Sequence, residues 1–387
     1  MTSSYRKTPP NRAIGLATAP VTSHSLYTSK LRQLGLSAPE QIPVSWDWRE
    51  ERKKGNLSPL TKPKQQSYCG NCWAMSSTAS FADRWIIATN DNTISNYSFN
   101  PLLTTVCTDS LHPEASDGCG GGLPENCQTF FEQQGAIIDK SYPNCPSWED
   151  YCGKSNPPCC GGCDLNPDLS KDNPPFSCKN LTVPSDAKKY KAITGTMKAN
   201  TVMTADNKVD TQATINSIKT DILYHGPVVA KFVVWNDFIN DLNPNINDNT
   251  KRWASTDNIY IHGSYNKDDA NKQDGFHAVV IIGWGMSSKN IPYWIVKNSW
   301  GDWNKDGHFF FAMYTDNEKR NVDCGMDIPF MDQDQLFGGT ISFVQTSGFG
   351  GQSDNQTKPS KSNRNWIWIT IIIIALLLLI ICYKLFK

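Results

Sequence analysis

The sequence predicts an α+β fold of two packed subdomains, the first helical and the second β-rich. Residues 72–88, "CWAMSSTASFADRWIIA", carry small and apolar side chains on nearly all faces and no Pro or Gly, which predicts a buried helix that starts near Cys72. Later, "GPVVAKFVVW", "FHAVVIIGWG", "PYWIVKNSW" and "HFFFAMY" are short apolar runs bounded by Gly, Pro or Asn, which predict strands. A cleft between the two subdomains is the expected place for a site.

The two subdomains form a globular body, and the segments before and after it differ in composition. Residues 1–41 form a polar arm that is a candidate short propeptide, and "IPVSWDWRE" opens a denser, aromatic-rich body at 42–335. Polar stretches within the body, at 195–212 and 240–275, are expected to be surface loops. Residues 336–365 are rich in Gly, Ser and Asn, which predicts a flexible stalk.

Residues 366–383, "WIWITIIIIALLLLIICY", predict a membrane anchor. The run is uncharged, long enough to cross a bilayer as a helix, and has aromatic residues at both ends. The alternative is a buried core helix, which is rarely so uniformly apolar. With only a short tail at 384–387, we expect a single-pass anchor in an endomembrane, cell or virion membrane, and the few flanking basic residues do not predict its side.

The composition argues against a nucleic-acid partner and leaves open the state of the many cysteines. Lys+Arg and Asp+Glu both total 37, so no nucleic-acid partner is expected. The 13 cysteines exceed ordinary usage and predict either disulfides or metal binding, depending on the compartment. The N-terminal segment lacks an apolar run of signal-peptide length, so the compartment is not evident from the sequence.

The segment "QSYCGNCW" at 66–73 contains a C-x-x-C motif with several possible roles. It could be a redox dithiol, half of a zinc site, one arm of a disulfide, or a place where one cysteine is reactive. Cys72 lies at the expected helix start, where free N–H groups and the helix dipole stabilise a thiolate and a neighbouring imidazolium would lower its pKa further. Among six histidines, His277 opens a predicted strand of the second half, although a lone histidine there is more often a packing residue.

Four motifs together resemble the papain family of cysteine proteases. "QSYCGNCW", "GCGGG" (118–122), "FHAVVIIGWG" and "YWIVKNSWG" occur in the order typical of that family, and "IPVSWDWRE" resembles the opening of its mature enzymes. The resemblance covers 42–330. It implies a helical L domain packed on a β-barrel R domain, and hydrolysis of protein or peptide substrates through an acyl-enzyme without cofactor or metal.

The resemblance also implies a role for each motif residue. Cys72 is the nucleophile and His277 the general base, Asn298 orients the imidazole, and Trp300 shields that hydrogen bond from water. Gln66 donates its side-chain amide to the oxyanion hole together with the Cys72 backbone N–H.

Further family features concern substrate binding and structure. Cys69 is expected to form a disulfide with Cys119, and Gly121 and Gly122 to offer backbone to an extended substrate. Pro329 occupies the position that resembles the base of the S2 pocket, which predicts an apolar preference at P2.

Three segments point to the cathepsin B-like branch: "HGPVVAKFVVWNDF", "GWGMSSKNIPYWIVKNSW" and "DCGMD". In cathepsin B two adjacent histidines on an occluding loop hold the substrate's C-terminal carboxylate. The corresponding insert here, 144–180, contains no histidine, which predicts an endopeptidase without dipeptidase activity.

The remaining cysteines are even in number. They are Cys107, Cys127, Cys145, Cys152, Cys159, Cys160, Cys163 and Cys178, once Cys382 in the apolar run and Cys324, which the resemblance implies is free, are set aside. They allow four disulfides. "CCGGC" at 159–163 could instead bind zinc, but no histidine accompanies it and no metal is expected. One setting for disulfides without a signal peptide is a large DNA virus with its own thiol-oxidising machinery.

Two other classes of function account for fewer of these motifs. A catalytically inactive papain-like membrane protein, acting in binding or structure, would normally have lost a catalytic group, yet Gln66, Cys72, His277 and Asn298 are all retained. A thiol oxidoreductase using Cys69 and Cys72 leaves the His, Asn and Gly motifs unexplained. The sequence makes no prediction of oligomeric state.

Overall fold

The computed structural model describes residues 42–345 except 52–58, 67–68, 114, 117, 143–144, 146, 153–177, 180, 241–256, 264–272, 305 and 333–334. The chain divides into the units Met1–Phe349 and Gly350–Lys387, and every described residue belongs to the first. The predicted arm at 1–41, the apolar run at 366–383 and the tail at 384–387 lie outside the described residues. None of the helices in the described ranges combines the length and apolar character that a bilayer crossing needs.

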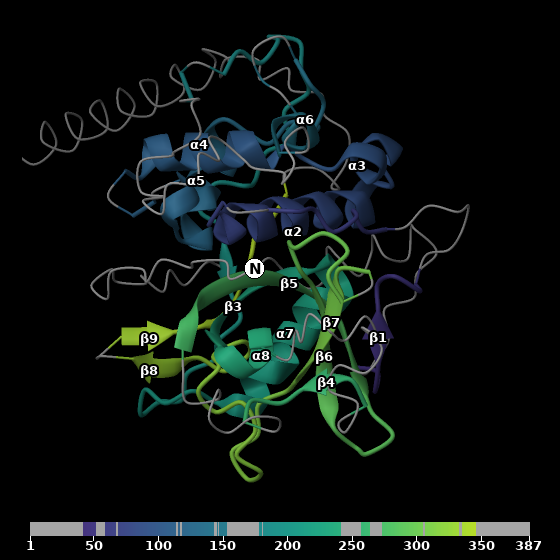
Figure 1. Cartoon of the computed structure of the whole chain (residues 1–387), viewed down its shortest axis with the longest axis vertical. Helices are drawn as coiled ribbons and strands as arrows, with labels where there is room; N and C mark the ends of the chain where they lie inside the picture. The colour runs from purple at the N-terminus through teal and green to yellow at the C-terminus, as the bar shows by residue number, and fades with distance from the viewer. Residues whose placement is uncertain are drawn as a thin grey trace, which may run out of the picture. The chain divides into compact units, whose positions relative to one another are not determined.

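The helical subdomain is built on α2 (Cys72–Thr89), which starts at Cys72 as predicted. Figure 1 shows α3 (Asn92–Tyr97), α4 (Pro101–Leu111), α5 (Cys127–Gln133) and α6 (Trp148–Cys152) on one side of it and the sheet on the other. Two short 3-10 turns, Gly118–Gly120 and Pro124–Asn126, precede α5. Nearly every side chain of α2 is buried because helices and sheet enclose it, which explains why its sequence has no polar face.

The β-rich subdomain is one large sheet with two helices. Its strands are β1 (Trp46–Asp47), β2 (Lys198–Ala199), β3 (Val228–Trp235), β4 (Ile259–Tyr260), β5 (Gln273–Met286), β6 (Pro292–Lys297), β7 (His308–Ala312) and β10 (Gly339–Ser342). The order is β2-β10-β3-β5-β6-β7-β4, and β1 pairs with β5. Hydrogen bonding among the described strands thus follows an open path from β2 to β4, whereas the resemblance implied a barrel.

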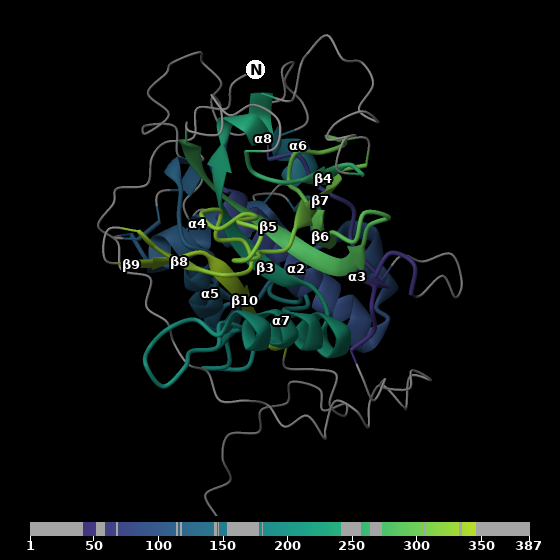
Figure 2. The ribbon, with the colours of Figure 1, turned by 90° about the horizontal axis from the view of Figure 1, so that it is seen from below.

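The four strands predicted from apolar runs correspond to β3, β5, β6 and β7. Helix α7 (Thr211–His225) lies alongside β3 and β5, as Figure 2 shows, and α8 (Asn236–Asn240) follows β3 directly. A separate hairpin pairs β8 (Phe330–Asp332) with β9 (Gln335–Phe337). The predicted α+β fold with helical and β-rich parts is confirmed.

Each subdomain has its own core, and β3 and β10 connect them. Phe81 and Phe131 stack in the helical core with ring centroids 4.4 Å apart, and Phe343 packs edge-on against Phe131 at 5.1 Å. Val229 of β3 and Ile341 of β10 also belong to this helical cluster. A second cluster under the sheet includes most of the other buried side chains of β3 and β5–β7. The two subdomains therefore share strands.

One predicted domain boundary and two predicted surface loops were wrong. The body does not end at 335, because β10 lies between β2 and β3 and Phe343 is completely buried. The stretch 195–212 is more than a surface loop, since it supplies β2 and the buried Asn200. Likewise 240–275 supplies the buried strand β4. These strands are only two to four residues long, and so short a segment carries no visible period.

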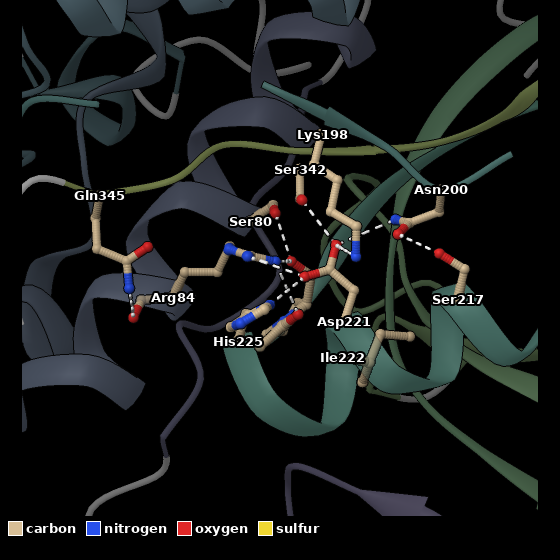
Figure 3. A network of polar contacts seen from close by, with 12 residues as sticks. Ser80, Arg84, Lys198, Asn200, Ser217, Asp221, Ile222, His225, Ser342 and Gln345 are labelled. Atoms are coloured by element: carbon tan, nitrogen blue, oxygen red, sulfur yellow. Dashed lines mark hydrogen bonds and ion pairs between the residues drawn. The ribbon is translucent and has the colours of Figure 1, made fainter. Parts of the chain in front are cut away.

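A buried ionic network connects the two subdomains, as Figure 3 shows. The carboxylate of Asp221 on α7 accepts hydrogen bonds from Arg84 of α2 (3.2 Å), His225 Nδ1 (2.8 Å), Asn200 (3.1 Å) and Ser342 (2.7 Å), and Lys198 Nζ lies 3.9 Å away. Burial alone would raise the pKa of this carboxyl, but the charges of Lys198 and Arg84 outweigh it and hold the pKa well below its ordinary value. We call these six residues the Asp221 network.

Candidate active site

Cys72 lies where the start of α2 meets strand β5. Its side chain is buried, and the backbone amides of Ala278, Trp73 and Cys72 itself lie within hydrogen-bonding range of the sulfur. Ala278 follows His277 on β5, so the sulfur sits next to the segment that carries the proposed base. Burial nevertheless dominates and raises the pKa of the Cys72 thiol to about 11.

The imidazole of His277 is held in one orientation. Its Nε2 lies 2.8 Å from Oδ1 of Asn298, and the ring stacks on Trp300 with centroids 4.8 Å apart. The backbone N–H of Ser299 also donates to Asn298 Oδ1, at 2.8 Å, which identifies that atom as an acceptor oxygen. Nε2 must therefore carry the proton, and Nδ1 is the basic nitrogen of the neutral ring.

Burial lowers the pKa of His277 to about 4, although its hydrogen bond with Asn298 raises it. Burial thus shifts the pKa of each group in the direction that disfavours its charged form. This differs from the sequence-based expectation that an imidazolium lowers the thiol pKa. The physical reason is that both groups are desolvated together, and burial disfavours the charged form of each.

Gln66 is fixed on both sides of its amide. Its backbone N–H donates to Ser299 O at 2.8 Å, its Oε1 accepts from Ser299 Oγ at 2.5 Å, and its Nε2 donates to Cys69 O at 2.9 Å. Cys69 in turn forms the disulfide with Cys119 that the resemblance implied. The predicted oxyanion donor is thus attached to the segment next to Asn298 as well as to the one that leads into Cys72.

The glycine segment is packed against Trp73, the residue that follows Cys72. A Cβ on Gly122 would lie 2.5 Å from the ring of Trp73, whose Nε1 donates to Gly118 O at 3.3 Å. Gly121 has φ +130°, a conformation that L side chains rarely adopt. Close packing on Trp73 is therefore a second reason for glycine here, beside the predicted substrate backbone. Pro329 is buried near Gly339 of β10, and its role at P2 stays a prediction.

The comparisons with known proteins decide the family. Residues 42–330 match the model described as papain family cysteine protease. The chain belongs to the papain family. It is 30% identical over 294 residues to cathepsin B-like cysteine proteinase 1 of Ostertagia ostertagi, covering 74% of this chain and 72% of that protein. It is 28% identical over 292 residues to cathepsin B-like cysteine proteinase 1 of Haemonchus contortus, covering 74% and 71%.

A solved structure supports the same fold. Procathepsin B S9 from Trypanosoma congolense superposes with a TM-score of 0.52 at 19% identity, covering 89% of this chain and 88% of that chain. The family and the fold together identify a cysteine-type peptidase with cathepsin B-like relatives.

The cysteines of this papain-family chain differ from the full pairing that their number allows. Cys107 forms a disulfide with Cys178, and Cys127 and Cys145 are buried free thiols, while Cys152, Cys159, Cys160 and Cys163 lie outside the residues whose side chains the structure describes. Cys324 is free, as the resemblance implied. The described residues contain no cluster of three or more side chains suited to a metal, and "CCGGC" lies outside them.

Sequence reasoning missed a buried ion pair beside the site. Lys297, the last residue of β6 and the neighbour of Asn298, pairs with Asp83 of α2, and both side chains are almost fully buried. Lys297 also donates to Thr61 Oγ1 at 3.1 Å. The available signal was a charged residue within an otherwise apolar helix and another at the end of an apolar strand, because such residues are rarely buried without a partner.

Proposed function

We propose that this papain-family chain is a membrane-tethered endopeptidase whose nucleophile is Cys72 and whose general base is His277. The observation that carries the assignment is the tautomer that Asn298 and Ser299 impose on His277, since it leaves Nδ1 as the basic nitrogen beside the segment that contacts the Cys72 sulfur. Nδ1 can therefore accept the proton of the Cys72 thiol.

The reaction follows from these positions. The Cys72 sulfur attacks the peptide carbonyl carbon while its proton passes to His277 Nδ1, and the carbonyl oxygen becomes an oxyanion near the amides of Gln66 and Cys72. The imidazolium then gives its proton to the leaving amine, which leaves a thioester on Cys72. Water, deprotonated by His277, attacks the thioester and releases the carboxylic acid.

An epoxide inhibitor of papain-like enzymes tests the nucleophile. We expect one covalent label on the wild-type protein, mapped by mass spectrometry to Cys72, and no label on Cys72→Ala. Cys127→Ala removes another buried free thiol and serves as the matched control, which should label as the wild type does. An unlabelled but folded wild-type protein would indicate the inactive alternative.

The endopeptidase assignment is supported by the absence of histidine from the insert at 144–180. Peptides with free and amidated C-termini, cleaved by the purified enzyme, should yield internal fragments at similar rates. Efficient stepwise release of C-terminal dipeptides from the free form alone would contradict it. A library varied at P2 should favour apolar residues if Pro329 lines that pocket.

The membrane tether is supported by the apolar run at 366–383. When the full chain and a chain that ends at residue 349 are expressed in the same cells, only the full chain should remain with membranes after a carbonate wash. Equal recovery of both chains in the soluble fraction would exclude the anchor. Protease protection of the tagged full chain would show on which side of an endomembrane, cell or virion membrane the peptidase lies.

A further inference from the structure

The segment that carries Gln66 lies between two other parts of the chain. On one side is the segment that follows Asn298: Ser299 O accepts the Gln66 N–H at 2.8 Å, and the Gly301 N–H donates to Lys64 O at 3.1 Å. On the other side are Asp139 and Trp148, the first residue of α6, neither of which the sequence singled out.

Trp148 holds the residue directly before Gln66. Its indole Nε1–H donates to the carbonyl oxygen of Gln65 at 2.8 Å, and its side chain is only 2% exposed. The Gln65 carbonyl and the Gln66 N–H belong to the same planar peptide group. Trp148 therefore holds one end of that plane while Ser299 O holds the other, which fixes the direction in which the Gln66 side chain leaves the backbone.

Asp139 ties Trp148 to the same segment by a second route. Its Oδ1 accepts the backbone N–H of Trp148 at 2.8 Å, and its Oδ2 lies 2.6 Å from Lys64 Nζ. The Asp139 carboxylate is almost fully buried, and Lys64 is partly exposed. The charge of Lys64 thus balances a buried carboxylate, while the carboxylate holds the backbone of Trp148 at the start of α6.

We propose that Trp148 and Asp139 are positioning residues for the oxyanion hole, acting through the peptide group between Gln65 and Gln66. The inference rests on the proposed function, because it assumes that Gln66 donates to the oxyanion. A donor must lie within a few tenths of an ångström of its ideal place to stabilise the oxyanion fully. Rotation of this peptide plane would weaken transition-state stabilisation and leave substrate binding largely unchanged.

Trp148→Phe tests this directly, because it keeps an aromatic ring and removes only the indole N–H. Trp48→Phe is the matched control: Trp48 is 1% exposed and its Nε1 donates to Ile222 O at 2.8 Å in the β-rich core. Four quantities are compared: kcat and KM for a peptide substrate, the affinity for a peptide aldehyde, and the rate of Cys72 alkylation by iodoacetamide.

The two reagents separate positioning from general damage. The aldehyde adds the Cys72 S–H across its C=O and gives a hemithioacetal whose oxygen occupies the oxyanion position. In the alkylation, a bond forms between sulfur and the CH₂ carbon, iodide leaves, the thiol proton is lost, and no oxyanion develops. Only the first reaction depends on the placement of Gln66.

We expect Trp148→Phe to lower kcat about tenfold with KM little changed, because losing an oxyanion donor outright costs 100-fold or more and a misplaced donor costs less. Aldehyde affinity should fall by a similar factor, while the iodoacetamide rate stays within about twofold of wild type. Trp48→Phe should leave all four quantities unchanged. Asp139→Asn, which removes the charge facing Lys64, should show the same selectivity with a smaller effect.

Two results would overturn the inference. One is an unchanged aldehyde affinity in both Trp148→Phe and Asp139→Asn, and the other is an equal loss of aldehyde binding and alkylation, which indicates a distorted site. Failure of the proposed function looks different: the wild-type protein would then be alkylated at Cys72 yet neither cleave peptides nor bind the aldehyde.

Discussion

Cys72 and Asp83 lie on the same buried helix, α2, and both face the β-rich subdomain. At Cys72, burial raises the pKa of the thiol to about 11 and lowers that of His277 to about 4, which disfavours the charged form of each. At Asp83 and its neighbour Arg84 the polar groups form ion pairs with Lys297 and Asp221. One helix thus carries two kinds of buried polar site.

The two sites show that buried polar groups can serve either structure or reaction. Asp221 accepts four hydrogen bonds and has a low pKa, so its proton state is fixed and its groups hold the subdomains together. Asn298 Nδ2 has no hydrogen-bond partner among the described residues, and burial favours the uncharged forms of Cys72 and His277. Saturated charges suit a structural contact, and neutral groups suit a reaction.

Replacing one histidine at each site should give the largest contrast. His277→Ala removes the proposed base and should lower kcat/KM at least about 100-fold with little change in melting temperature. His225→Ala removes one hydrogen bond to Asp221 and should destabilise the fold by about 1–3 kcal/mol while the activity per folded molecule stays near wild type. Steady-state kinetics and thermal melts measure both, and an equal loss of activity in the two variants would erase the distinction.

Asp221→Asn should have the largest effect on stability. It leaves the Arg84 guanidinium buried without its carboxylate partner, and breaking a buried pair typically costs about 3–5 kcal/mol. Urea denaturation measures the change, and active-site titration should show unchanged activity for each folded molecule. Asp316→Asn, in an exposed pair with Lys319, is the control and should leave the midpoint unchanged. A stable Asp221→Asn protein would show that the network contributes little.

The two sites should also differ in the pH at which they affect stability. The pKa of His277 is about 4 in the folded state and about 6.5 in an unfolded chain, so between these values only the unfolded chain binds a proton. The free energy of unfolding should therefore decrease as the pH decreases through this window, by at most about 1.4 kcal/mol per pH unit from this group. His277→Gln should make the dependence of stability on pH less steep than in the wild type. The contribution of His225 cancels in this comparison because both proteins contain it.

Asp221 has the opposite ordering, because its folded pKa lies below its ordinary value. Its contribution is complete above about pH 4, the unfolded value, and is lost only as pH falls further. Urea midpoints at pH 7, 5.5 and 4.5 would measure the His277 effect before that loss begins. An identical pH slope for His277→Gln and wild type would contradict the assigned shift.

The smallest predicted effect concerns a serine at each site. Ser299→Ala removes the hydroxyl that donates to Gln66 Oε1, and one hydrogen bond of about 1 kcal/mol corresponds to roughly a fivefold lower kcat. Ser217→Ala removes a bond of Ser217 Oγ to Asn200 Oδ1, next to the Asp221 network, and should leave kcat unchanged. Equal rates for the two variants would mean that Ser299 does not hold the Gln66 amide.

Local patterns predicted the elements that carry the site. The start of α2 at Cys72 and the position of His277 in a strand follow from apolar runs and their boundaries, whereas the roles came from the family resemblance. The pairing of Asp83 with Lys297 was not predictable, because no local rule relates residues so far apart in the chain. The pKa directions were also missed, because they depend on how deeply both groups are buried.

Strand β10 has a consequence for the order in which the enzyme is made. It lies between β2 and β3, and β3 pairs directly with the strand that carries His277. A ribosome releases the chain from its N-terminus, so Cys72 and His277 are both synthesised before the strand that completes their sheet. A growing chain therefore holds all its reactive groups before it holds the complete scaffold that aligns them, and peptidase activity should appear only after residue 342 has emerged.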